Sequence, residues 1–214
     1  MKKAALAVLS LALVGAVASA PAFAGTLYSN GPVNGTFDAV TINGGQEISD
    51  SFTLTSTSTI TGADFGAWLF TGDTLSSVDW SIGTTPFGGS VSTASTTGVF
   101  DFNNGGGFDI YTESFSTGSL TLGPGTYYLT LQNAVASNGD SAFWDINNGP
   151  SVAYFQNEGA SGNLNGVFEP GSNSEAFDID GTSGGPVIPE PSSFLLLGSG
   201  LVSFAGMMRR KLKA

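Results

Sequence analysis

The sequence contains no cysteine and no histidine, and all of its basic residues lie in the two end segments. These residues are Lys2, Lys3, Arg209, Arg210, Lys211 and Lys213. Residues 25–188 therefore cannot build a Ser-His-Asp, Cys-His or Ser-Lys nucleophile, nor a zinc site with His or Cys ligands. Disulfides are absent as well, so stability must come from a packed core. We expect a protein that is not an enzyme.

The charge of residues 25–188 is entirely negative. Of the seventeen Asp and Glu residues only Glu190 lies outside this segment, which leaves sixteen carboxylates and no basic side chain. Such a surface cannot neutralise phosphates, so nucleic acid and anionic lipid are poor partners, whereas cations and uncharged polymers fit. We interpret the carboxylates mostly as a solvated surface. A catalytic carboxylate pair of the glycosidase type is the disfavoured alternative, because no two acids are singled out.

Residues 1–24 have the pattern of a secretory signal peptide. A short basic start at Lys2 and Lys3 precedes an apolar run over residues 4–18, and residues 22–24, Ala-Phe-Ala, follow the small-x-small rule. We expect cleavage after Ala24, so that the exported chain begins at Gly25.

The pattern of residues 25–182 predicts an all-β domain: a jelly-roll-like sandwich of two antiparallel sheets, with roughly ten or eleven strands. Residues 64–70 are apolar on both faces, which indicates a covered central strand. Residues 103–107, Asn-Asn-Gly-Gly-Gly, indicate a hairpin turn. In the strand predicted at 47–55, Asp50 interrupts an otherwise apolar face. The three tryptophans, Trp68, Trp80 and Trp144, are expected to point inward.

Oxygen-rich turns provide a candidate calcium site, because calcium prefers oxygen ligands. Asp101 and Asn103 begin like a calcium loop, and Asp178 and Asp180 form a similar fragment. The acidic residue expected twelve positions along is missing, and turn chemistry alone accounts for Asn, Asp and Gly at such places. We therefore expect no cofactor, with calcium as the alternative.

Aromatic side chains provide a candidate sugar-binding surface. Tyr128 and Phe143 are the candidates for stacking on sugar rings, because their positions predict more exposure than those of the tryptophans, which mainly supply core area. A carbohydrate-binding module for extracellular polysaccharide is therefore the alternative to a non-enzymatic surface or matrix protein.

The C-terminal segment, residues 189–214, has three parts in a fixed order. Pro189, Glu190 and Pro191 come first, an uncharged apolar run over residues 192–208 follows, and the basic cluster comes last: Arg209, Arg210 and Lys211. At about 1.5 Å per helical residue the apolar run reaches roughly 25 Å, enough to cross a hydrocarbon core as a transmembrane helix. The basic cluster would stay on the cytoplasmic side. Residues 183–188, with Ser, Gly and Pro, are expected to form a flexible linker.

This tail resembles the PEP-CTERM sorting signal of bacteria with an outer membrane. The resemblance implies recognition by an exosortase, a membrane-embedded cysteine transpeptidase, and transit through the inner membrane to the cell surface or extracellular matrix. Family members are often linked to extracellular polysaccharide and biofilm. An ordinary single-pass anchor is the alternative. The resemblance implies nothing about what residues 25–182 bind.

Overall fold

The computed structural model describes residues 25–36, 38–157, 160–163 and 174–184. The regular elements in these ranges are β-strands in antiparallel pairs, which confirms the predicted all-β antiparallel class. Within the same ranges, no helix combines the length and the apolar character needed to cross a bilayer. The predicted signal helix at 1–24, the sorting motif at 189–191 and the apolar run at 192–208 lie outside the described residues.

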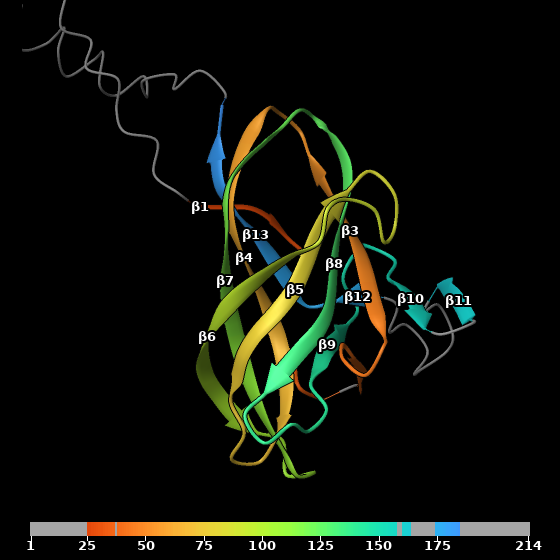
Figure 1. The fold of residues 1–214 in the computed structure, drawn as a ribbon. Helices are drawn as coiled ribbons and strands as arrows, with labels where there is room; N and C mark the ends of the chain where they lie inside the picture. The colour runs from red at the N-terminus through yellow and green to blue at the C-terminus, as the bar shows by residue number, and fades with distance from the viewer. Residues whose placement is uncertain (1–24, 37, 158–159, 164–173, 185–214) are drawn as a thin grey trace, which may run out of the picture. The chain divides into compact units, whose positions relative to one another are not determined.

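Thirteen strands follow one another in the described part of the chain (Figure 1). Their bounds are β1 (Gly25–Ser29), β2 (Asp38–Thr41), β3 (Glu47–Leu54), β4 (Ser58–Phe70), β5 (Leu75–Gly83), β6 (Ser92–Asn103), β7 (Phe108–Leu122), β8 (Gly125–Ala136), β9 (Phe143–Asn147), β10 (Tyr154–Asn157), β11 (Ala160–Asn163), β12 (Ser174–Glu175) and β13 (Phe177–Ser183).

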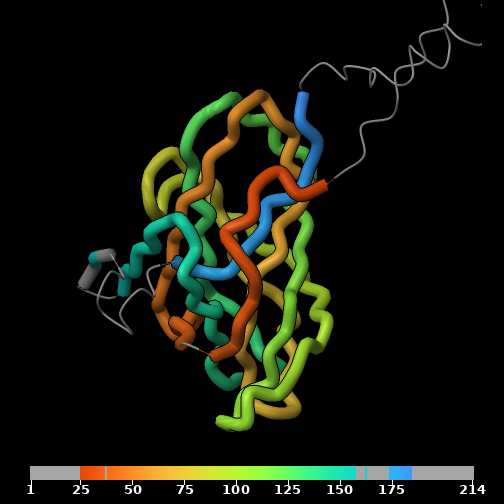
Figure 2. Tube along the Cα trace, turned by 180° about the vertical axis from the view of Figure 1, so that it is seen from behind, coloured from red at the N-terminus to blue at the C-terminus, as the bar shows by residue number. Residues whose placement is uncertain are grey.

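The strands form two layers that share β6, and Figures 1 and 2 show these layers from opposite sides. The first sheet runs β1-β13-β4-β7-β6, with β9 beside β4 and β2 and β12 on β9. The second sheet runs β6-β5-β8-β3-β10-β11. Residues 92–95 of β6 pair with β5, whereas residues 96–103 pair with β7. β6 therefore passes from one layer to the other and closes that edge of the domain.

The core lies between the two layers. Trp80 of the second sheet is only 9% exposed and its ring lies 5.8 Å from that of Phe115 in the first sheet. Trp144 is fully buried and donates its indole N–H to the Ala176 carbonyl at 2.9 Å. These two placements confirm the predicted inward tryptophans. The prediction is wrong for Trp68, which is half-buried on the opposite face of β4, because it alternates with the buried Ala67.

Several strands are longer than the sequence pattern predicts. β4 runs unbroken through Gly62, where the pairing with β7 shifts register. A Cβ at Gly62 would come within 2.8 Å of the Phe115 carbonyl oxygen, so only glycine allows the two backbones this close approach. β1 and β11 have no counterpart among the predicted strands. β13 ends at Ser183, the first residue of the predicted linker.

Candidate functional site

Among the described residues, six carboxyl side chains are buried, and residues 25–188 contain no basic residue to pair with them. They are Asp50, Asp73, Asp109, Glu113, Asp145 and Glu175. The expectation of a mostly solvated set of acids is therefore wrong for these six. A buried carboxylate without an opposite charge needs hydrogen-bond donors or a proton, and the six differ in which of these they have.

Asp145 holds a loop onto the outer face of the first sheet. Its carboxylate accepts hydrogen bonds from the backbone N–H of Asn34 at 2.8 Å and of Gly35 at 3.0 Å, and from the Trp68 indole at 2.6 Å. Burial raises the pKa of Asp145 to about 6, and these three donors limit the rise. A Cβ at Gly66 would lie 2.8 Å from the Asp145 Cβ, so glycine makes room for this contact. The role of Asp145 is therefore structural: its carboxylate fixes the loop at Asn34 and Gly35 to the sheet.

Asp50 and Glu175 lie in the interior and connect the two layers. The Asp50 carboxylate, on β3, accepts the Glu175 backbone N–H at 2.8 Å, the Ser51 N–H at 2.6 Å and the Asn30 amide at 3.1 Å. The Glu175 carboxyl, on β12, has no hydrogen-bond partner within the described ranges. Burial raises the pKa of Asp50 to about 7; burial and the nearby Asp50 charge raise the pKa of Glu175 well above its usual value. Burial and the Asp50 charge therefore both favour the protonated form of Glu175.

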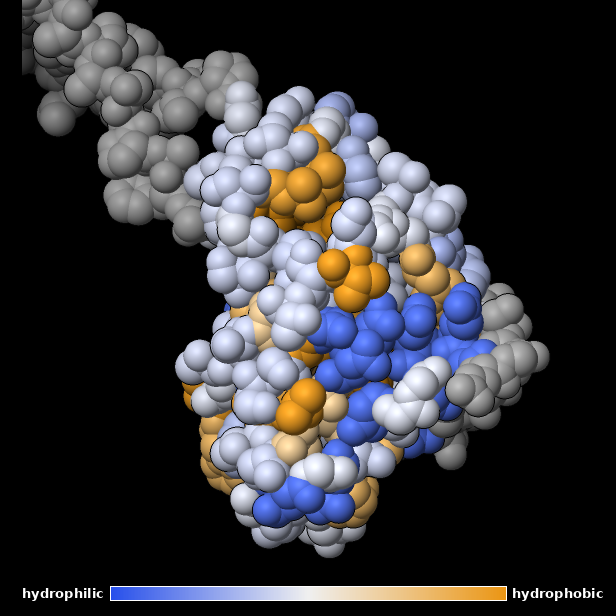
Figure 3. Space-filling view, in the orientation of Figure 1, coloured by the Kyte–Doolittle hydropathy of each residue, from blue (hydrophilic) through white to orange (hydrophobic). Residues whose placement is uncertain are grey.

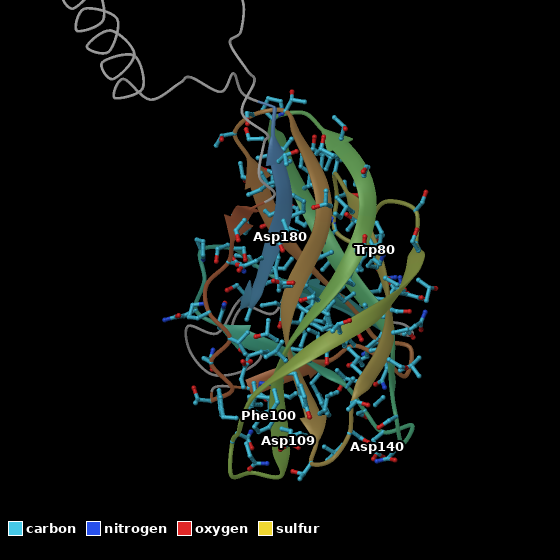
Figure 4. The ribbon with its side chains drawn as sticks, turned by 90° about the vertical axis from the view of Figure 1, so that its left-hand side faces the viewer. Trp80, Phe100, Asp109, Asp140 and Asp180 are labelled. Atoms are coloured by element: carbon cyan, nitrogen blue, oxygen red, sulfur yellow. The ribbon has the colours of Figure 1, made fainter. Side chains whose placement is uncertain are left out.

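Glu113 and Asp109 face the interior side of β7. Burial raises the pKa of Glu113 to about 7, and a Cβ at Gly98 would collide with its carboxyl group, so this glycine provides the space that Glu113 occupies. Asp109 accepts the Gly72 N–H at 3.0 Å and the Asn103 amide at 2.7 Å. Figure 4 shows Asp109 beside Phe100, at the end of the domain away from Asp180. Asp109 thus connects the turn after β4 to the end of β6.

The four residues considered for calcium are only partly brought together. Asp101 and Asp178 line one open groove of about 620 Å³ with Asp64, on the outer face of the first sheet. Asp180 lines a neighbouring hollow that also includes Asp64. The Asn103 amide is engaged with Asp109 instead. Across the described ranges, no three acidic side chains are grouped closely enough to hold a metal ion. Calcium binding stays a prediction.

Phe143, one of the two sugar-stacking candidates, belongs to a packed aromatic cluster on the outer face of the first sheet. Its ring meets Phe108 at 5.6 Å and Phe70 at 6.2 Å, both edge to face, and Trp68 packs against Phe108 at 5.6 Å. Phe70 is 41% exposed, whereas Phe143 is half-buried. Because the neighbouring rings occupy much of its surface, Phe143 is a poor stacking surface for a sugar.

Tyr128, the other candidate, lies on the outer face of the second sheet and has a partner that the sequence did not reveal. Its ring lies 6.1 Å from that of Tyr154 at an interplanar angle of 69°. The two tyrosines come from β8 and β10, which are separated by β3 in the sheet. The contact between the two rings depends on the register in which β8, β3 and β10 pair. No sequence pattern within β8 or β10 predicts this contact.

Residues 187–211 match the family model of the PEP-CTERM protein-sorting motif. The match includes the Pro-Glu-Pro element, the apolar run and the basic cluster through Lys211. No curated protein is significantly similar to the chain.

Proposed function

We propose that this chain, which carries a PEP-CTERM sorting motif, is a non-enzymatic protein of the cell surface or extracellular matrix. The match at residues 187–211 is the observation that carries the proposal. The motif implies export, anchoring in the inner membrane during transit, and sorting through an exosortase. The signal peptide at 1–24 supplies the entry to this route.

In this proposal the tail is a removable anchor. The apolar run 192–208 stops transfer and the basic cluster Arg209–Lys211 stays in the cytoplasm, so the Pro-Glu-Pro element faces the outer side of the inner membrane. Pro189 and Pro191 keep their backbone out of a helix, which suits an extended substrate in a protease groove. Glu190 is the charge that a basic group of the exosortase would recognise.

The non-enzymatic role is supported by the way in which the domain uses its acids. Nucleophiles that depend on His, Cys or Lys are unavailable in residues 25–188. Asp145 and Asp109 accept backbone N–H groups and hold loops, and Asp50 ties two strands together across the core. The buried carboxyl groups of raised pKa thus have structural partners or lie enclosed in the core, away from open surface.

Fractionation and mass measurement of the protein in the producing bacterium test the sorting proposal. We expect the surface protein to begin at Gly25 and to lack residues 192–214. Replacing Glu190 with Ala should leave the protein in the inner membrane with its tail attached. Asp140→Ala, which removes an exposed acid from the folded domain, is the matched control and should be released normally. Surface protein that still carries residues 192–214 would show a permanent membrane span.

A polysaccharide-binding module is the second candidate function. The Tyr128–Tyr154 pair supports it, because the two rings lie on an outer sheet face next to polar side chains. The absence of basic residues from residues 25–188 favours uncharged polysaccharides over acidic ones.

A further inference from the structure

We propose that the outer face of the second sheet around Tyr128 and Tyr154 is a binding platform for one chain of an uncharged polysaccharide. The inference rests on the polysaccharide-binding function above and adds the site and the class of glycan. Three features carry it: the tyrosine pair, a row of polar side chains in which Gln132, Glu47 and Gln156 make no hydrogen bonds to other described residues, and an uncharged polar hollow.

The tyrosine pair is held by strands on both sides. Tyr128 lies on β8, opposite Gly83 of β5 and Ser51 of β3, and Tyr154 lies opposite Ser49. Neither tyrosine hydroxyl is hydrogen-bonded to another described residue, so both groups can bind a ligand. Aromatic rings fixed by a sheet lose little conformational entropy on binding, which favours them as anchors.

The loop between β5 and β6 borders the pair and is itself fixed to the sheet. The Ser81 hydroxyl donates to the Gly88 carbonyl at 2.9 Å, and the Phe87 N–H donates to the Ser49 hydroxyl at 3.3 Å. A Cβ at Gly83 would collide with the Gly88 backbone, so the loop packs directly on β5. Figure 1 shows this loop standing out from the sheet. The loop covers the sheet between Tyr128 and Gln132, where Ser49, Ser81 and Thr130 are buried, and it borders the tyrosine pair.

A row of polar side chains crosses the same face next to the rings. Gln132 of β8 lies opposite Asp79 of β5 and Glu47 of β3, and Glu47 lies opposite Gln156 of β10. The row is two residues along the strand from Tyr154, or about 7 Å. The side chains of Gln132, Glu47 and Gln156 make no hydrogen bonds to other described residues. Figure 3 shows strongly hydrophilic side chains gathered on the face that this sheet presents.

A polar hollow of about 570 Å³ continues the row beyond β3 and β10. Gln46 and Asn157, the chain neighbours of Glu47 and Gln156, are in its lining with Asn43. The remaining lining residues are Thr41, Gly44, Gly45 and Ser141, so the hollow contains no charged side chain. The hollow thus begins at the chain neighbours of two residues of the polar row, Glu47 and Gln156.

The chemistry of these three features matches an uncharged glycan. A sugar ring has an apolar C–H face that can cover a tyrosine, and hydroxyl groups that both donate and accept hydrogen bonds. Glutamine and asparagine amides also donate and accept, so they can satisfy such hydroxyls in either direction. Glu47 and Asp79 would repel an acidic polysaccharide, and the domain has no basic residue to offset that repulsion.

Binding of soluble polysaccharides to the full chain in mild detergent tests the inference. The uncharged probes are dextran, galactomannan and mixed-linkage β-glucan, with alginate as the polyanion and chitosan as the polycation. In native gels that contain each polysaccharide, we expect at least one uncharged probe to slow the migration of the protein. Alginate should not slow it. Tyr128→Ala and Tyr154→Ala should each weaken that binding roughly tenfold or more, as buried aromatic anchors do at interfaces.

Phe100→Ala is the matched control. Phe100 and Tyr111 form a similar edge-to-face pair, with ring centroids 5.6 Å apart, on the first sheet and without the amide row. Phe100 is 53% exposed, so its loss should change neither folding nor binding. Gln132→Ala and Gln156→Ala provide a second test that does not alter the rings, and each should weaken binding several-fold. Thermal unfolding of every variant shows whether it has folded.

The outcomes separate the site from the function. Uncharged polysaccharide bound equally well by the Tyr128, Tyr154 and Gln132 variants would overturn the platform and leave polysaccharide binding in place. Absence of binding to every uncharged probe by the wild-type chain would overturn both. Binding to chitosan alone, abolished by Glu47→Gln, would identify a polycation as the ligand and also overturn the inference. The sorting proposal is measured separately by fractionation.

Discussion

On the outer face of the first sheet, Asp145 accepts three hydrogen bonds and fixes a loop, and four aromatic rings pack against one another. On the outer face of the second sheet, Gln132, Glu47 and Gln156 make no hydrogen bonds to other described residues, and the Tyr128 ring packs against that of Tyr154. Both faces are built from the same acidic, amide-rich composition. The difference is that the first face engages Asp145 and its aromatic rings within the fold, whereas the second face leaves these three side chains without partners among the described residues.

Removing Asp145 should produce the largest loss of stability on either outer face. Asp145→Ala leaves the N–H groups of Asn34, Gly35 and Trp68 without their acceptor, and each buried unsatisfied donor costs about 1–3 kcal/mol. We expect the free energy of unfolding to fall by about 3 kcal/mol or more, measured by urea denaturation. Glu47→Ala on the second face, where the side chain makes no hydrogen bond to another described residue, should cost less than about 0.5 kcal/mol. Equal losses would remove the distinction between the two faces.

Acidic pH should stabilise the domain, because of its buried carboxyl groups. Unfolded Asp and Glu titrate near pH 4, whereas burial raises the pKa of Asp50 and of Glu113 to about 7 and that of Glu175 well above its usual value. Between these values the folded protein retains protons that the unfolded chain has lost. Stability is therefore greatest near pH 4 and falls as the pH rises to about 7, by about 1.4 kcal/mol per unit of pKa shift.

Glu175→Gln isolates the buried contribution to this pH profile. It replaces an acid whose pKa is raised by burial with a neutral amide of similar shape, so it should flatten the profile and raise stability at pH 8. Asp140→Asn removes the same charge from an exposed position and should change the profile little. A profile of Glu175→Gln that parallels the wild-type profile would show that general repulsion among surface acids, and not burial, causes the pH dependence.

The strands and the core could be predicted from the sequence, because the alternation of apolar and polar residues along each strand is a local pattern. Trp80 and Trp144 share strand faces with apolar residues, and burial is the result. Asp50 interrupts such a face, and alternation alone cannot tell that its partners Asn30 and Glu175 come from distant strands. Burial of a carboxylate thus depends on contacts made across the two layers.

The candidate binding face depends on register as well. Tyr128 could be selected from its position in β8, whereas Tyr154, Gln132 and Gln156 become a site only when β8, β3 and β10 align. The sequence predicted an exposed side chain for Phe143 as it did for Tyr128, yet Phe108 and Phe70 pack against the Phe143 ring. Exposure predicted from alternation therefore fails where another strand or loop covers the outer face.

Calcium binding to the first face should produce a smaller change in stability. Adding calcium tests whether acids on this face are available to a ligand. Asp64, Asp101 and Asp178 line its groove. With the millimolar Kd of weak extracellular sites, about 10 mM calcium would stabilise the domain by about 1.4 kcal/mol, seen as a higher thermal midpoint. Asp178→Asn should abolish the shift, and Asp79→Asn should preserve it. An unchanged midpoint, or an equal shift with magnesium, would leave these acids as surface charge.

The smallest expected effect on stability concerns the free amides of the second face. Gln132 and Gln156 make no hydrogen bonds within the described structure, so replacing either with Ala removes no interaction on which the fold depends. We expect each change to alter the free energy of unfolding by less than about 0.5 kcal/mol, in urea denaturation of the full chain in detergent. The same variants should weaken polysaccharide binding, and this separation of binding from stability is what a ligand-facing row requires. A loss above about 1 kcal/mol would place these amides among the groups that hold the fold, as Asp145 does on the first face.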